Sequence, residues 1–135
     1  MRFRLIGHPD LESQVPKVFA ADPKHGPVAV AKIRALLESF DEDPAWLEPT
    51  PVAQQTQWVT LWDEARSVAW QADVTIYIYE AWGLRFAIAR VTLPGDRVVG
   101  ALLMVETQAA AARDITSQNL ALALLAKVEE LIWPT

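Results

Sequence analysis

The chain has 135 residues, of which 52% are hydrophobic and 21% are charged, a composition typical of one globular domain with a substantial core. Its 17 acidic and 12 basic residues give a formal net charge of -5, which repels phosphate backbones and anionic lipids, so we expect neither a nucleic-acid nor a membrane partner. The chain contains no cysteine, which excludes disulfides and thiolate chemistry and favours a reducing compartment.

The first part of the chain, 1–43, is predicted to hold a strand followed by helices. Arginines alternate with apolar residues over 2–6, as in a short half-buried strand, and His8-Pro9-Asp10 ends it. A short helix could follow from Asp10 to Phe19, provided that Pro16 is accommodated. A second helix is predicted from Pro27 to Phe40, because its apolar residues recur at steps of three and four. The apolar run near Met1 is too short for a signal peptide, and no later run has membrane-spanning length, so we expect a cytoplasmic protein.

Three further segments complete the predicted organisation. A proline-rich connector covers 44–55, where the prolines hold the backbone extended. Period-two patterning over 56–106 predicts four strands joined as hairpins, with turns at 63–66, 80–83 and 94–96. The last segment, 107–135, reads as a long helix from Ile115 to Trp133, with Asp114 or Thr116 as N-cap and the alanine-rich stretch 107–113 as an extension of its start.

This order of elements predicts a single α+β domain over 1–135. We expect a four- to five-stranded antiparallel meander sheet packed on two or three helices, with a long helix last. A helix-grip arrangement is one version of this fold, because it also places paired helices after the first strand and a long helix at the end. The resemblance concerns topology alone.

The predicted hairpins assign residues to the two faces of the sheet. A turn centred between Ala81 and Trp82 places Asp73 opposite Arg90 as a cross-strand ion pair. One face is then apolar apart from Arg85, and the other is rich in aromatic residues. Because both faces are apolar, both should be covered. If both helices packed on the first face, the aromatic face would stay open for a partner; if they split between the faces, the domain would close on itself.

The leading functional hypothesis is a non-enzymatic interaction or adaptor domain that binds a protein partner or a second copy, forming a homodimer, through the aromatic face. The alternative hypothesis is a domain that binds a small apolar ligand in a pocket between the sheet and the C-terminal helix, oriented by Asp73, Arg90 or Tyr77. The candidate interface or ligand residues are Trp58, Trp62, Tyr77, Tyr79, Leu84, Phe86, Ile88, Leu103, Asp73 and Arg90.

No catalytic residue, metal ligand or cofactor is predicted. His8 and His25 lack a closely spaced partner ligand and are expected to be solvated loop residues, and the acidic run 41–43 lacks the spacing of a calcium loop. The chain has no glycine-rich phosphate loop and no nucleophile elbow. Glu80 at a hairpin tip and Glu106 at a strand end are expected to be ordinary surface residues.

Overall fold

The computed structural model describes residues 2–40, 48–63, 67–93, 95, 97–111 and 115–129. In chain order the elements are β1 (Arg2–Gly7), α1 (Leu11–Ala21), α2 (Gly26–Glu38), β2 (Ala53–Asp63), β3 (Val68–Ala81), β4 (Leu84–Leu93), β5 (Arg97–Thr107) and α3 (Ser117–Glu129). The predicted α+β class is confirmed.

The five strands form one sheet in the order β1-β5-β4-β3-β2. Strands β2 to β5 pair antiparallel with their sequence neighbours, which is the predicted meander. Strand β1 lies at the other edge and pairs parallel with β5, so that Arg2 faces Arg97 and Gly7 faces Leu102. The sheet is therefore mixed, and β2 is an edge strand of the described sheet.

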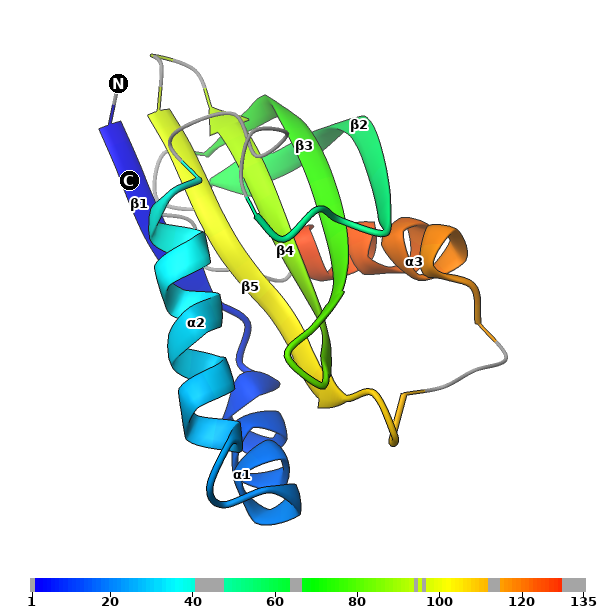
Figure 1. Ribbon diagram of the computed structural model, residues 1–135. Helices are drawn as coiled ribbons and strands as arrows, with labels where there is room; N and C mark the ends of the chain where they lie inside the picture. The colour runs from blue at the N-terminus through cyan, green and yellow to red at the C-terminus, as the bar shows by residue number, and fades with distance from the viewer. Residues whose placement is uncertain are drawn as a thin grey trace.

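The helices cover both faces of the sheet (Figure 1), with α1 and α2 on one side and α3 on the other. Helix α1 packs against β5 and α2, and α3 packs mainly against β2 and β3. Each face has its own cluster of buried apolar side chains. Of the two arrangements that the sequence left open, the structure has the split one, in which the domain closes on itself.

The two N-terminal helices approach each other closely at Gly26. A Cβ atom on Gly26 would lie 2.9 Å from the backbone oxygen of Val18 in α1, so only glycine fits at this distance. Helix α1 continues through Pro16 to Ala21, beyond the predicted end at Phe19. The buried residues on this side of the sheet come from both helices and three strands: Val18, Ala29, Ile33, Leu36, Leu37, Phe40, Tyr77, Tyr79, Leu84, Phe86, Ile88 and Val105.

The hairpin between β3 and β4 corrects the predicted register. It turns through two residues, Trp82 and Gly83, with φ of 56° and 74°, as two-residue hairpin turns require. Tyr79 therefore faces Phe86, and Arg90 faces Thr75 instead of Asp73. Because the offset is two residues, every side chain of this hairpin keeps its predicted face.

On β5 the offset is a single residue from Arg97 to Leu102, so the predicted faces are wrong for this part of the strand. Val99 faces Val91 instead of Arg90, and it packs in the cluster under α3. A bulge opposite Ala87 and Ile88 then leaves Leu103 without a facing residue on β4. Leu103 belongs to the α3 side instead of the aromatic side, in the same alternation as Val99. Because the bulge adds one residue to β5, Val105 lies on the aromatic side again.

The region after β5 also differs from the prediction. Strand β5 extends to Thr107, and a turn follows at 108–110 where an extension of the last helix was predicted. The predicted N-cap Thr116 is confirmed, because its Oγ1 accepts a hydrogen bond from the backbone N–H of Asn119 at 3.2 Å. Residues 41–47, 64–66, 112–114 and 130–135 lie outside the described residues. They include the whole acidic run 41–43, part of the connector and the predicted helix end at Trp133.

Candidate functional site

Most of the predicted aromatic surface is covered by this chain's own helices. Tyr79, Phe86 and Ile88 are fully buried, and Leu84 and Tyr77 are nearly so. Tyr79 stacks on Phe86 with ring centroids 5.0 Å apart, and Phe40, just after α2, meets the Tyr77 ring edge-on at 5.6 Å. Leu103 is buried under α3. These six predicted residues are therefore core side chains and are not at the surface of the described structure.

The two remaining aromatic candidates, Trp58 and Trp62, are exposed on β2, at 67% and 58%. Both face the side of the sheet that carries α1 and α2, since Trp58 lies opposite Asp73 and Trp62 opposite Ala69. The other residues of β2 on this face, Gln54, Thr56 and Thr60, are polar. We call this surface the β2 tryptophan face and define it by five residues: Gln54, Thr56, Trp58, Thr60 and Trp62.

Hydroxyl and amide groups order the β2 tryptophan face. Gln71 Nε2 donates a hydrogen bond to Thr60 Oγ1 at 2.9 Å, and the hydroxyls of Thr56 and Thr75 are 3.0 Å apart. On the opposite face of the same strand, Val59 and Leu61 are buried under α3. Strand β2 is thus fixed by its packing and by its pairing with β3, while its outer edge borders no other described strand.

The predicted ion pair between Asp73 and Arg90 does not form in this register. Arg90 Nε donates a hydrogen bond to the backbone oxygen of Phe40 at 2.9 Å, which joins the centre of the sheet to the end of α2. Asp73 is half-buried beside Trp58 and faces Thr92 on β4. The two residues therefore lie on the same face with separate neighbours.

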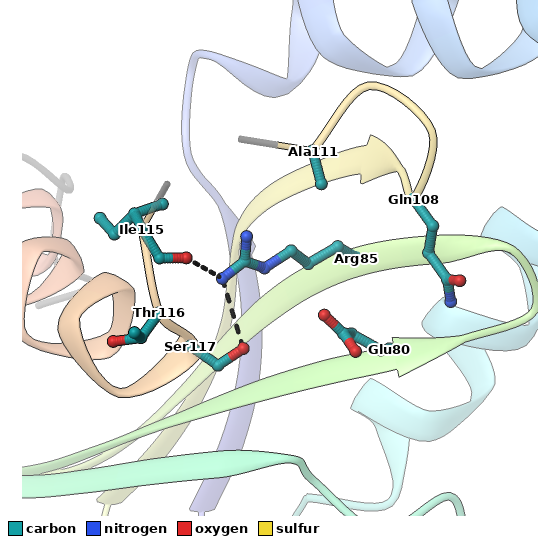
Figure 2. Close-up of a pocket in the computed structure, with 7 residues that line it drawn as sticks. All are labelled: Glu80, Arg85, Gln108, Ala111, Ile115, Thr116 and Ser117. Atoms are coloured by element: carbon teal, nitrogen blue, oxygen red, sulfur yellow. Dashed lines mark hydrogen bonds between the residues drawn. The ribbon is translucent and has the colours of Figure 1, made fainter. Parts of the chain in front are cut away.

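A cavity of about 360 Å³ lies at the opposite end of β3 from the tryptophans (Figure 2). Arg85 on β4 lies at its centre and is only 4% exposed. Its Nη2 donates to Ser117 Oγ at 3.3 Å and lies 3.5 Å from the backbone oxygen of Ile115. The lining residues are Glu80, Arg85, Gln108, Ala111, Ile115, Thr116 and Ser117. The sequence hypothesis placed an apolar ligand between the sheet and the C-terminal helix. This cavity lies at the start of that helix, and most of its described lining residues are polar.

Two carboxylates flank Arg85 in the sheet register. Glu80 faces it from β3 and Glu106 faces it from β5. Burial raises the pKa of Glu106 above its ordinary value, and the charge of Arg85 opposes this shift. The sequence prediction treated both glutamates as ordinary surface residues and so missed the grouping. The signal for it was Arg85, a charged residue on an otherwise apolar strand face.

The histidines differ in their environments. His8 is buried, contrary to its predicted solvated position, and its Nδ1 accepts a hydrogen bond from the backbone N–H of Asp10 at 3.1 Å. Asp10 also accepts a hydrogen bond from Lys127 of α3, and this bond holds the pKa of the Asp10 carboxyl below its ordinary value. His25 is exposed beside Asp22. These contacts tie α1 to α3 and brace the turn between α1 and α2.

Other kinds of site were also sought in the described ranges. No group of three or more His, Asp or Glu side chains there is arranged to hold a metal ion. None of the described helices has the length and apolar character needed to cross a membrane. Comparisons with protein-family models, with curated proteins and with solved structures found no match.

Proposed function

We propose that this chain is a non-enzymatic interaction domain that forms a homodimer through β2. The observation that carries the proposal is the pair of exposed tryptophans, Trp58 and Trp62, on an edge strand. Tryptophan is enriched at the energetic centres of protein interfaces because it buries a large area at low entropic cost. The lack of cysteines fits a reducing cytoplasm.

The edge itself supports pairing with another strand. An edge strand presents unpaired backbone N–H and C=O groups, and natural proteins usually protect such edges with lysine, proline, bulges or a very short strand. Strand β2 is 11 residues long, and 53–62 contains neither a charged residue nor a proline. One contact from α3 reaches this strand's backbone, from Gln118 Nε2 to the oxygen of Gln54 at 3.2 Å. Residues 53–62 of β2 therefore lack the charged residues and prolines that usually keep an edge strand from pairing with another strand.

A second copy of this chain is the partner that the uncharged sequence of β2 favours. Antiparallel pairing of β2 with its own copy, centred on Trp58, sets Gln54 opposite Trp62 and Thr56 opposite Thr60 of the other copy. No like charges face each other in this pairing, although the whole chain carries a net charge of -5. The four tryptophans of the dimer would supply about 600 Å² of buried area, which is a little over a third of the roughly 1,600 Å² of a standard interface.

The proposal keeps the homodimer of the sequence hypothesis and moves its interface. Of the ten candidate residues, Trp58 and Trp62 carry it, with Asp73 beside Trp58. The six core residues are not part of this interface: five of them are buried on the side of α1 and α2, and Leu103 is buried under α3. The strand edge, which the sequence hypothesis did not consider, supplies directional hydrogen bonds in addition to apolar area.

Sedimentation velocity of three proteins tests this proposal. The wild type is expected to sediment as a dimer, and Trp58→Lys as a monomer, because two like charges would meet at the two-fold axis. Val28→Lys is the matched control, since Val28 is 54% exposed on α2, away from β2, and it should remain a dimer. A wild type that stays monomeric at the highest attainable concentration would overturn the proposal, as would a dimer that survives Trp58→Lys.

A further inference from the structure

The first turn of α3 holds the start of β2. Gln118 Nε2 donates a hydrogen bond to the backbone oxygen of Gln54 at 3.2 Å and another to Oε1 of Gln55 at 2.6 Å. An amide nitrogen carries two hydrogens, so it can make both bonds at once. In Figure 1, α3 begins on the β2 side of the sheet. The Gln118 side chain therefore joins the start of the helix to the edge strand.

The Gln54 oxygen belongs to the open edge of β2. In an antiparallel pair, opposite side chains approach more closely at the positions whose backbone groups do not bond across the pair. The hydroxyls of Thr56 and Thr75 face each other at 3.0 Å, which assigns Thr56 to such a position. Because the direction of the backbone groups alternates along a strand, Gln54 and Trp58 share it. Gln118 thus binds an acceptor that points away from β3.

The proposed dimer needs this acceptor. Antiparallel pairing centred on Trp58 sets Gln54 opposite Trp62 of the second copy, so the Gln54 oxygen would accept the backbone N–H of that Trp62. In the single chain Gln118 donates to this oxygen instead, and its amide stands where the N–H of the second copy would have to come. Two-fold symmetry repeats this conflict at both ends of the paired strands.

Helix α3 fixes the position from which Gln118 reaches β2. The hydroxyl of Thr116 caps the first turn by accepting a hydrogen bond from the Asn119 N–H at 3.2 Å. One turn further on, Ala121 and Leu124 are buried against the sheet. Gln118 itself is exposed, so rotation of its side chain breaks the contact without moving the helix. The contact is therefore reversible and weakens pairing without preventing it.

We propose that the contact between Gln118 and Gln54 is an autoinhibitory contact of the β2 dimer. Each chain must release its own Gln118 before the two strands can pair along their full length. The contact takes the place of the charged residues and prolines that usually protect an edge strand, and it restricts pairing to concentrated protein. This inference rests on the proposed dimer and adds a means of regulating it.

Sedimentation equilibrium of the wild type and two variants tests this proposal. Gln118→Ala should dimerise with a Kd at least about fivefold lower than that of the wild type, because the contacts of two Gln118 side chains no longer have to be broken. Asn119→Ala is the matched control, since it removes an exposed amide from the same turn of α3, and it should keep the wild-type Kd.

The outcomes separate the autoinhibitory contact from the dimer itself. A dimer of Gln118→Ala that is as weak as the wild-type dimer, or weaker, would overturn the role of Gln118 and leave the dimer in place. If wild type and Gln118→Ala both stay monomeric at the highest attainable concentration, the dimer and its regulation are overturned together.

The side-chain amide of Gln118 provides a second measurement in the wild type. Its ¹⁵N–¹H signals should shift with rising protein concentration in step with the dimer fraction, because the amide leaves the Gln54 oxygen. The amide of Gln108 is the control, since its Nε2 donates to the backbone oxygen of Leu84 at 3.3 Å, and its signals should not shift. Gln118 signals that stay constant while the dimer forms would show that the contact survives pairing and would overturn the proposal.

Discussion

Trp58 and Trp62 lie four residues apart on one face of β2, and both remain more than half exposed although the opposite face of the same strand is buried under α3. Two large apolar side chains in this position contribute little to the core of a single chain. Their area is available to a partner, and the strand beside them offers backbone hydrogen bonds. This asymmetry is the basis of the proposed dimer.

The first prediction separates surface aromatic residues from core ones. At a dilution where the protein is monomeric, Trp58→Thr should change the free energy of unfolding by less than about 0.5 kcal/mol, because the side chain is exposed. Phe86→Ala should cost about 3–5 kcal/mol, because Phe86 is fully buried against Tyr79. Urea denaturation measures both values. A large loss for Trp58→Thr would show that β2 packs against a part of its own chain.

The second prediction tests the strand register. Arg90→Met removes the hydrogen bond to the buried Phe40 and leaves that carbonyl unsatisfied, which should cost about 1–3 kcal/mol. Asp73→Asn should cost less than about 0.5 kcal/mol, because Asp73 faces Thr92 and Trp58 and has no partner charge in Arg90. Equal losses in the two variants, together with strong coupling in the double variant, would indicate the Asp73–Arg90 pair that the sequence suggested.

The third prediction concerns stability at high pH. The Tyr79 hydroxyl is buried and finds no hydrogen-bond partner among the described residues, and burial raises the pKa of Tyr79 above its ordinary value of 10.0. The folded state therefore keeps this phenol protonated, while the unfolded state releases its proton above about pH 10. Stability contributed by the protonated group is present below pH 10 and falls as the pH rises above it.

Tyr79→Phe is the matching variant. Because it removes a buried hydroxyl without a partner, it should leave the free energy of unfolding unchanged or raise it by about 1 kcal/mol at neutral pH. Above pH 10 its stability should fall less steeply than that of the wild type. Denaturation curves at several pH values measure this difference. Parallel pH profiles for the two proteins would show that the Tyr79 phenol does not cause the fall in stability above pH 10.

The fourth prediction tests the close approach of α1 and α2. Alanine is usually favoured over glycine in a helix, by about 1 kcal/mol. At position 26 the added Cβ would press on the Val18 backbone oxygen, so Gly26→Ala should instead destabilise the protein by about 1–3 kcal/mol. Thermal denaturation shows whether Gly26→Ala stabilises or destabilises the protein. A stabilised variant would mean that the two helices are farther apart.

Local sequence patterns predicted most of the elements. The helical spacing of Ile33 and Leu36 and the alternation along β3 and β4 depend on residues close in sequence, so α2 and the meander could be recognised. The hairpin register was off by two residues because the positive φ of Trp82 is atypical of that residue type. Strand β5 was off by one residue from its start, because three residues separate Leu93 from Arg97 where a two-residue turn was expected. The bulge at Leu103 then restored the predicted faces, which alternation alone does not reveal.

The sequence could not predict which face of the sheet each helix covers. The exposure of the candidate site residues depends on this arrangement. With α1 and α2 placed on the aromatic face, Tyr77 and Phe86 became core residues, and among the candidate aromatic residues only Trp58 and Trp62 stayed exposed. The grouping around Arg85 depends on pairing between three strands and on the position of α3. Such long-range relationships are set by tertiary packing and leave only a weak local signal.

Amide hydrogen exchange of β2 at low and high protein concentration tests the central proposal most directly. In an antiparallel sheet every second amide of β2 points away from β3. If β2 pairs with a second copy, these outward amides within 53–63 should exchange rapidly in dilute protein and slowly in concentrated protein, while the inward amides stay protected throughout. Exchange of the outward amides that is equally fast at all concentrations would contradict a dimer built through this strand.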